Sequence, residues 1–206
     1  MKTIAMSMGQ QFIESRNESR DFIDTKLVEF VSSQLNFEVI LISNFIQKNV
    51  NKQKKKLNLL LYKNKVKGII LSGGQDIGTN KLRDKTEISL IDFAIKNQIP
   101  LIGICRGMQL INLYFNGELK KIKGHVANKI KIYSQLTKKK RVVKCFHSNG
   151  IKKIGKNLNE TYRSNDGIIE AFKGDKHRIL GIMWHPERNK KVSNEDIKLF
   201  KECLKK

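Results

Sequence analysis

Five short apolar runs are the feature that most restricts the fold of this chain. A strand with one solvated face alternates polar and apolar residues, whereas a strand buried on both faces is apolar throughout. The runs cover residues 3–7, 37–42, 68–73, 99–104 and 179–184. Continuous runs of this length predict parallel strands in the interior of an α/β protein.

Helical patterns lie between these runs. In residues 20–35 and 85–98, apolar positions recur every three or four residues, which is typical of an amphipathic helix. Alternation of strands and helices predicts a doubly wound, mainly parallel α/β sheet with functional groups at the carboxyl ends of its strands. The less regular, more basic stretch 119–163 predicts β-hairpins or loops.

Length and composition indicate one domain over residues 1–206, because no linker rich in proline, glycine or serine divides the chain and there are only two prolines. The three cysteines are an odd number, without a C-x-x-C pair or a metal-like cluster with the four histidines. We therefore expect reduced thiols, no metal and no cofactor. The N-terminus has neither a signal-peptide pattern nor a membrane span, so we expect a soluble cytoplasmic protein.

The formal net charge of +22 raises the alternative of nucleic-acid binding. Most of the excess is lysine, scattered between apolar segments, and no helix-turn-helix, zinc or stacking motif accompanies it. We therefore expect a solvated basic surface and no nucleic-acid partner. Such a surface would attract a small anionic substrate, such as a nucleotide.

Cys105 has the surroundings expected of a nucleophile. Gly103 and Gly107 flank it in the pattern G-x-C-x-G, which suits the tight, strained turn from a strand to a helix. The helical pattern that follows would place Cys105 at a helix N-terminus, where the peptide dipoles favour a thiolate. The alternative is a small core cysteine, which has no need of both glycines.

Two further segments supply the groups that a nucleophile needs. His185 and Glu187 lie two residues apart after the last apolar run, so His185 could exchange a proton with Cys105 while Glu187 orients the imidazole. The glycines at 73 and 74, also after a strand, would expose backbone N–H groups. Together with the N–H of Arg106, these predict an oxyanion hole formed by the glycine loop and Arg106.

The segments around Cys105, Gly73 and His185 resemble the motifs of class I glutamine amidotransferase-like proteins, which have a flavodoxin-like sheet. The segments 83–87 and 164–172 resemble the γ-glutamyl-γ-aminobutyrate hydrolase branch. The N-terminal segment is similar to short members encoded with bacterial surface-polysaccharide genes, including γ-glutamyl-CDP-amidate hydrolases. The likeness extends over nearly the whole chain.

The resemblance implies a Cys105, His185 and Glu187 triad that hydrolyses a γ-glutamyl amide through a thioester and releases glutamate and an amine. It also implies that the N–H groups of Gly74 and Arg106 bind the oxyanion. The amine half could be a nucleotide amidate in surface-polysaccharide biosynthesis, or aminobutyrate. Matching positions imply further substrate-binding residues at Gly73, Gln109, His147, Ser148, Ser164, Asn165 and Asp166. Many relatives have glutamine at the positions of Ser148 and Met183, which leaves the leaving group open.

The alternative within the same chemistry is a glutaminase subunit that passes ammonia to a separate synthetase. A non-catalytic member of the fold has no need to keep the three spaced groups. His125 and His177 lie outside the motifs and are interpreted as structural or surface residues, and Cys145 and Cys203 as residues without a chemical role. A homodimer is left open.

Overall fold

The computed structural model describes residues 2–44 and 50–205, except the side chains of residues 50 and 51, so both predicted domain bounds lie outside the described residues. The strands are β1 (Thr3–Ser7), β2 (Gly9–Ile13), β3 (Glu18–Phe22), β4 (Glu38–Ile42), β5 (Val66–Leu71), β6 (Leu101–Ile104), β7 (Glu118–Lys121), β8 (Val126–Ser134), β9 (Lys140–Phe146), β10 (Asn149–Lys153), β11 (Leu158–Ser164), β12 (Ile169–Gly174) and β13 (Ile179–Ile182). The α-helices are α1 (Thr25–Glu29), α2 (Val50–Lys63), α3 (Lys81–Lys96), α4 (Arg106–Tyr114) and α5 (Asn194–Leu204).

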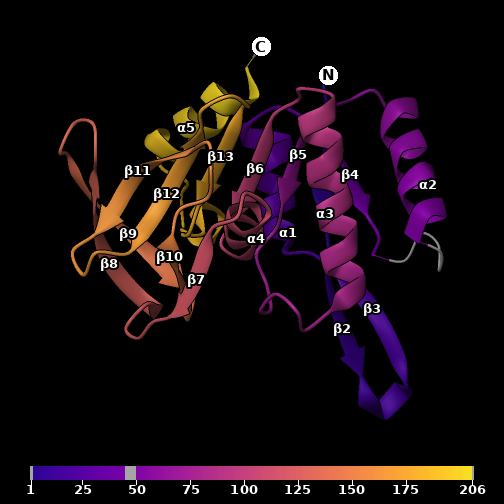
Figure 1. Ribbon diagram of the computed structural model, residues 1–206, viewed down its shortest axis with the longest axis horizontal. Coiled ribbons are helices and arrows are strands. Elements are labelled where there is room, and N and C mark those ends of the chain that lie inside the picture. The colour runs from indigo at the N-terminus through magenta and orange to yellow at the C-terminus, as the bar shows by residue number, and fades with distance from the viewer. Residues whose placement is uncertain (1, 45–49, 206) are drawn as a thin grey trace.

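One large sheet runs through the molecule, and its two halves differ in strand direction (Figure 1). The order β4-β1-β5-β6-β13 is parallel throughout. From β13 the sheet continues through the antiparallel strands β12, β11, β8 and β9, while β10 pairs with β12 and β7. Strands β2 and β3 form a separate hairpin that projects from the body of the molecule (Figure 1).

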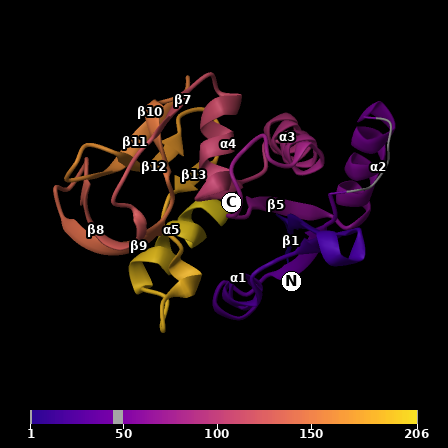
Figure 2. The same cartoon turned by 90° about the horizontal axis from the view of Figure 1, so that it is seen from below.

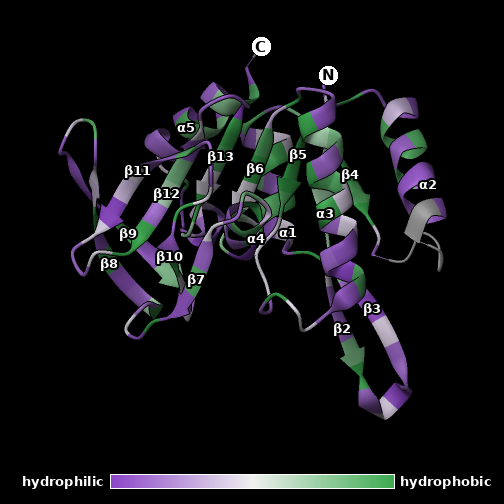
Figure 3. Ribbon diagram, viewed as in Figure 1, coloured by the Kyte–Doolittle hydropathy of each residue, from purple (hydrophilic) through white to green (hydrophobic). Residues whose placement is uncertain are grey.

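Helices cover both faces of the parallel half, with α2, α3 and α4 on one face and α1 and α5 on the other (Figure 2). Each face has its own apolar core. One core contains Leu57, Leu90 and Met108, and the other contains Phe30 and Phe200. The central strands are accordingly the most hydrophobic ribbons, whereas the projecting hairpin is largely polar (Figure 3). The predicted doubly wound α/β fold is confirmed.

The predicted strands are confirmed with ends shifted by up to two residues, but the helix predicted over 20–35 is partly wrong. Residues 20–22 belong to β3, and the helix begins at Thr25 because the Asp24 side chain accepts a hydrogen bond from the Lys26 N–H, 3.0 Å away. The second predicted helix begins earlier than expected, at Lys81. There the Asn80 side chain caps the N–H groups of Leu82 and Arg83.

The sequence did not predict the strands of the β2–β3 hairpin, the strand β12 or the helices α2 and α5. Helix α2 buries a narrow stripe at Gln53, Leu57 and Leu61, spaced four residues apart, within a lysine-rich segment. The irregular stretch 119–163 does form hairpin strands, as expected.

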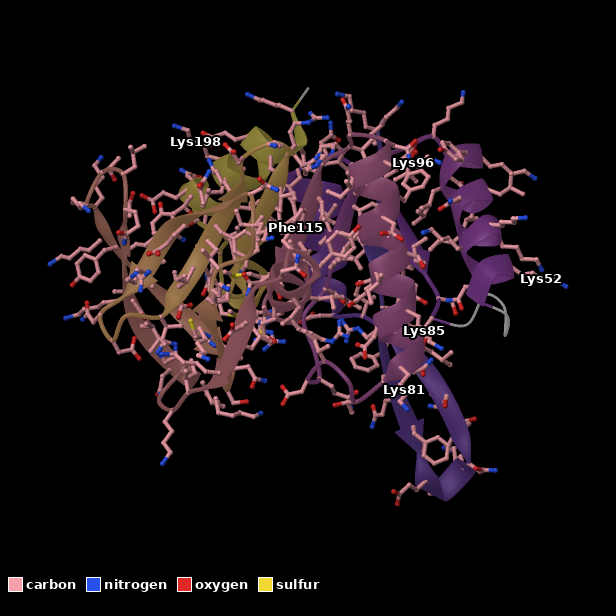
Figure 4. All side chains as sticks on the ribbon, in the orientation of Figure 1. Lys52, Lys81, Lys85, Lys96, Phe115 and Lys198 are labelled. Carbon is pink, nitrogen blue, oxygen red and sulfur yellow. The ribbon has the colours of Figure 1, made fainter. Side chains whose placement is uncertain are left out.

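Lysines are spread over several elements of the surface. Lys81, Lys85 and Lys96 on α3 and Lys198 on α5 are exposed and extend away from the body of the molecule (Figure 4). Among the described residues, every helix is too short or too polar to cross a membrane.

Candidate active site

The three predicted catalytic segments follow three neighbouring strands. In the sheet β6 lies between β5 and β13, all parallel, so their carboxyl ends meet at one edge. Cys105 follows β6, Gly73 and Gly74 follow β5, and His185 follows β13. The Cys105 N–H donates to the carbonyl of Ile182, 2.7 Å away, which ties the turn after β6 to β13.

Cys105 occupies a strained strand-to-helix turn. Its φ of 51° and ψ of −104° lie outside the regions that residues with a side chain prefer. The turn is possible only because its flanking residues lack side chains. A Cβ at Gly103 would lie 2.5 Å from the carbonyl carbon of Gly107, and a Cβ at Gly107 would lie 2.8 Å from the Cβ of Leu71. Such strain costs about 1–3 kcal/mol and is typical of active sites.

The Cys105 thiol is deeply buried, with 5% of the residue exposed. Burial raises the pKa of this thiol to about 12, and the nearby carboxylates of Glu187 and Glu170 add to the shift, while the Arg106 N–H opposes it. The neutral thiol is therefore the resting form. A thiolate requires a base that takes the proton and leaves a positive charge beside the sulfur.

Two neighbouring side chains position the imidazole ring of His185. Its Nδ1 lies 2.7 Å from Oε1 of Glu187, and the ring packs edge-on against Phe146 with centroids 5.8 Å apart. The two residues meet because Pro186–Arg188 forms a 3-10 turn. The contact between His185 and Glu187 that the sequence predicted is present. A carboxylate on Nδ1 leaves Nε2 as the nitrogen that can accept a proton.

The glycine loop after β5 is fitted around the imidazole. A Cβ at Gly73 would lie 2.5 Å from Cε1 of His185. Gly74 has a φ of 142°, a conformation that favours glycine.

A buried arginine on α3 stabilises this loop through hydrogen bonds to its backbone. Arg83 donates to the carbonyls of Ser72 and Gly73, at 2.9 and 2.8 Å, and its Nε pairs with Glu87 at 2.9 Å. The side chain of Arg106 joins the same network through Glu87 and Asp84. This positioning role of Arg83 was not predicted, because the segment 83–87 was identified only by its resemblance to a hydrolase family. Its helical i, i+4 spacing of arginine and glutamate was the available signal.

A small cleft of about 80 Å³ opens onto this edge of the sheet. Gly73, Gly74, His185 and Glu187 line it on one side. Its other side is formed by the base of the β2–β3 hairpin and the start of α1. The residues there are Gly9, Phe22, Ile23, Asp24 and Leu27.

The other predicted substrate-binding residues do not gather in this cleft. Gln109 is buried in α4, one helical turn after Cys105, and its side-chain amide donates to the carbonyl of Asn149 at 2.9 Å. Ser164 is buried at the end of β11, hydrogen bonded to Asp166 and to Ile168, and Ser148 is half-buried. Asn165 and Asp166 line a second pocket of about 350 Å³, together with Lys123, Gly124, His125, Lys129, Ile130 and Lys131.

The remaining predicted residue, His147, belongs to a buried cluster that sequence spacing did not reveal. Donor atoms of His125, Cys145, His147 and Glu170 all lie within 4.8 Å of one another. The expectation that the cysteines and histidines form no ligand-like cluster is therefore wrong. Cys145 and His147 are close in sequence, but His125 and Glu170 are each at least 20 positions away from them, and the fold of the sheet brings the four together.

Comparisons with known proteins agree with this arrangement. Residues 21–206 match the family model for class-I glutamine amidotransferases. A γ-glutamyl-CDP-amidate hydrolase from Campylobacter jejuni is 38% identical over 147 residues, covering 68% of this chain and 71% of the relative. A glutamine-hydrolysing GMP synthase subunit from Methanocaldococcus jannaschii is 33% identical over 143 residues, covering 66% of this chain and 72% of the relative.

Solved structures share the fold. A Thermoplasma acidophilum protein assigned as a GMP synthase subunit superimposes with a TM-score of 0.71 at 18% identity, covering 99% of this chain and 92% of the other. A glutamine amidotransferase from Thermotoga maritima gives a TM-score of 0.64 at 15% identity, covering 99% and 82%.

Proposed function

The chain belongs to the class-I glutamine amidotransferase family. We propose that it is a cysteine hydrolase that cleaves γ-glutamyl amides. The observation that supports this most strongly is the order β5-β6-β13, which gathers a strained cysteine, a histidine–glutamate pair and a glycine loop at one edge of the sheet. These are the nucleophile, base, orienting group and oxyanion donors of amide hydrolysis.

In the proposed mechanism, Sγ of Cys105 attacks the γ-carbonyl carbon while His185 takes the thiol proton. The carbonyl oxygen becomes an oxyanion that accepts hydrogen bonds from the N–H groups of Gly74 and Arg106. Collapse of this intermediate breaks the C–N bond, and His185 returns its proton to the departing amine. Water, deprotonated by His185, then attacks the γ-glutamyl thioester and releases glutamate and the thiol. Glu187 stabilises the imidazolium in both halves.

For the amine half, we propose a nucleotide amidate. The relative from Campylobacter jejuni supports this through its name and its 38% identity. The pocket with Lys123, Lys129 and Lys131 also supports it, because three ammonium groups in one pocket suit a diphosphate. We propose a small anionic substrate, rather than nucleic acid, as the partner of this basic surface.

A second candidate is a glutaminase that delivers ammonia to a separate synthetase. It is favoured by the 33% identity to the glutamine-hydrolysing GMP synthase subunit. The two candidates share the chemistry at Cys105 and differ in whether the chain acts alone.

The test is glutamate release by the purified chain from glutamine, γ-glutamyl-aminobutyrate, a γ-glutamyl polyamine and γ-glutamyl-CDP-amidate, each also with Cys105→Ala. We expect cysteine-dependent release from the nucleotide amidate far above the other substrates. Preference for another amide would overturn the assigned amine. Release that is unchanged in Cys105→Ala would overturn the thiol mechanism. Release from glutamine only when a synthetase is added would favour the second candidate.

A further inference from the structure

Four potential metal ligands converge in the antiparallel half of the sheet. His125 precedes β8, Cys145 is in β9, His147 follows β9, and Glu170 is in β12. All four are buried, with exposed fractions of 3% or less. This cluster is separate from the proposed triad and contributes no group to the proposed mechanism.

The outer nitrogen of each histidine is occupied. Nδ1 of His147 lies 3.1 Å from the carbonyl oxygen of Asn149, and Nε2 of His125 lies 2.8 Å from Oδ2 of Asp166. Because a carbonyl and an ionised carboxylate can only accept, both outer nitrogens carry the proton of a neutral ring. The inner nitrogens, Nδ1 of His125 and Nε2 of His147, then direct lone pairs at each other across 3.3 Å.

The acidic ligand also directs an unused acceptor into the cluster. Oε2 of Glu170 accepts from the Cys145 thiol at 3.5 Å, but no donor among the described residues is aligned with Oε1, although Nδ1 of His125 lies 3.1 Å away. Two imidazole lone pairs and a buried carboxylate oxygen thus face one another, and such an arrangement needs a cation at its centre.

We propose that His125, Cys145, His147 and Glu170 bind a divalent transition-metal ion, with Zn²⁺ as the best fit. Tetrahedral zinc with nitrogen, oxygen and sulfur ligands places its ligand atoms about 3.3–3.7 Å apart. The two inner histidine nitrogens lie 3.3 Å apart, His125 lies 3.1 Å from Oε1 of Glu170, and His147 and Cys145 each lie 3.5 Å from its Oε2. All four ligand atoms lie within 4.8 Å of one another, so a small contraction would bring the cluster to this geometry. One thiolate and one carboxylate would balance the charge of the ion, so the loaded site is neutral.

The outer partners are those of a metal-bound histidine. Ligating histidines commonly donate their second N–H to a carboxylate or a backbone carbonyl, as His125 does to Asp166 and His147 to Asn149. Asp166 and His125 also line the second pocket, which gives an ion a route from solvent. The ligand set, its spacing, its hydrogen-bonded partners and its access therefore agree.

A bound ion would also hold the wall of the active site. Phe146 lies between two of the ligands in sequence and packs against His185. The carbonyl of Asn149 accepts hydrogen bonds from both His147 and Gln109. Fixing Cys145 and His147 would therefore fix the positions of Phe146 and Asn149, which makes the cluster a positioning site for the catalytic edge.

The competing explanation is a proton in place of the metal. The Glu170 carboxylate 3.1 Å away raises the pKa of His125. Burial would raise the pKa of Glu170, but the neighbouring rings of His125 and His147 outweigh burial and lower it. An imidazolium–carboxylate pair would then occupy the cluster, and the experiment must separate the two.

The test is titration of the full-length Cys105→Ala variant with Co²⁺, which reports a thiolate ligand by a near-ultraviolet charge-transfer band. The Cys105→Ala background removes the proposed nucleophile as a competing ligand. We expect one tightly bound equivalent with tetrahedral visible bands, and displacement of these bands by Zn²⁺. The band should disappear when Cys145→Ser is added and persist when Cys203→Ser is added instead.

Absence of the bands, or bands that persist with Cys145→Ser, would overturn the proposal and favour the protonated cluster. Circular dichroism establishes whether the Cys145→Ser chain is folded. If it is not folded, Glu170→Gln in the Cys105→Ala background provides the decision, because it keeps the size of the side chain and removes its charge. We expect it to weaken Co²⁺ binding at least tenfold, and unchanged binding would overturn the proposal.

Discussion

Cys105 and Cys145 are both buried thiols in one sheet, but their surroundings differ in kind. Cys105 is in a turn with strained backbone angles, at the carboxyl end of β6. Cys145 lies within a regular strand and donates to a buried carboxylate. Burial raises the pKa of both thiols, so neither burial nor pKa separates them. Backbone strain and the identity of the neighbours are the features that separate a proposed nucleophile from a proposed ligand.

Replacement of the two thiols should give the largest contrast. Cys105→Ala should reduce γ-glutamyl hydrolysis by at least about 10⁴-fold, because no other group can form the thioester. Cys145→Ser should retain activity within about tenfold, and Cys203→Ser, in α5, serves as the matched control. Steady-state glutamate release measures all three. Equal losses at Cys105 and Cys145 would break the distinction between the two sites.

The histidines should differ next. His185→Ala should lower the turnover number by about 10³-fold, since general acid and base catalysis contributes about 10²–10⁴-fold. His147→Ala should lower the melting temperature, because it removes a buried ring and its hydrogen bond to the Asn149 carbonyl, with a much smaller effect on turnover. Rate measurements and thermal unfolding of both variants compare these effects. A larger rate loss at His147 than at His185 would reverse the assignment of the base.

The pH dependence of alkylation should sharpen the comparison further. In His185→Ala, the rate of iodoacetamide reaction at Cys105 should rise about tenfold per pH unit from pH 7 to 10, because the thiol pKa of about 12 keeps it protonated below that value. In the wild type the rise should be shallower, since His185 accepts the proton. Peptide mass spectrometry also reports Cys145, which should stay unmodified until the chain unfolds.

The smallest predicted effect concerns the strained turn itself. Gly107→Ala should reduce the free energy of unfolding by about 1–3 kcal/mol, because the new Cβ would overlap Leu71. Gly78→Ala is the comparison, since nothing lies within 4 Å of its Cβ position, although its φ is 91° whereas Gly107 lies in the helix α4. It should cost less, through backbone strain alone. Chemical denaturation measures both, and equal effects would argue against a crowded turn.

The sequence predicted the parallel half of the fold because its strands are buried on both faces and therefore continuously apolar. It predicted the positions of Cys105, His185 and the glycine loop because each depends on a local motif at a strand end. Helix α2 was missed because only three of its described side chains are buried, at positions four residues apart within a lysine-rich segment. The hairpin was missed because its strands are mostly polar.

The His125 cluster could not be predicted from spacing. Its members are separated by 20, 2 and 23 positions, and they come together only in the folded antiparallel half of the sheet, where β11 lies between β12 and β8 and β8 pairs with β9. The role of Arg83 was overlooked for a related reason. Arg83 lies on α3, whereas the backbone carbonyls that it contacts lie in the loop after β5. Local patterns identify a chemical group, whereas supporting contacts depend on the tertiary pairing.

The contact between Gly73 and the His185 ring has a consequence for sequence variation. The glycine is needed because the imidazole occupies the space of its Cβ, so the two positions should vary together across relatives. A chain that has lost the histidine would be free to carry alanine at the glycine position, and one that keeps the histidine would not. Covariation at this pair would therefore distinguish relatives that keep the catalytic base from those that have lost it.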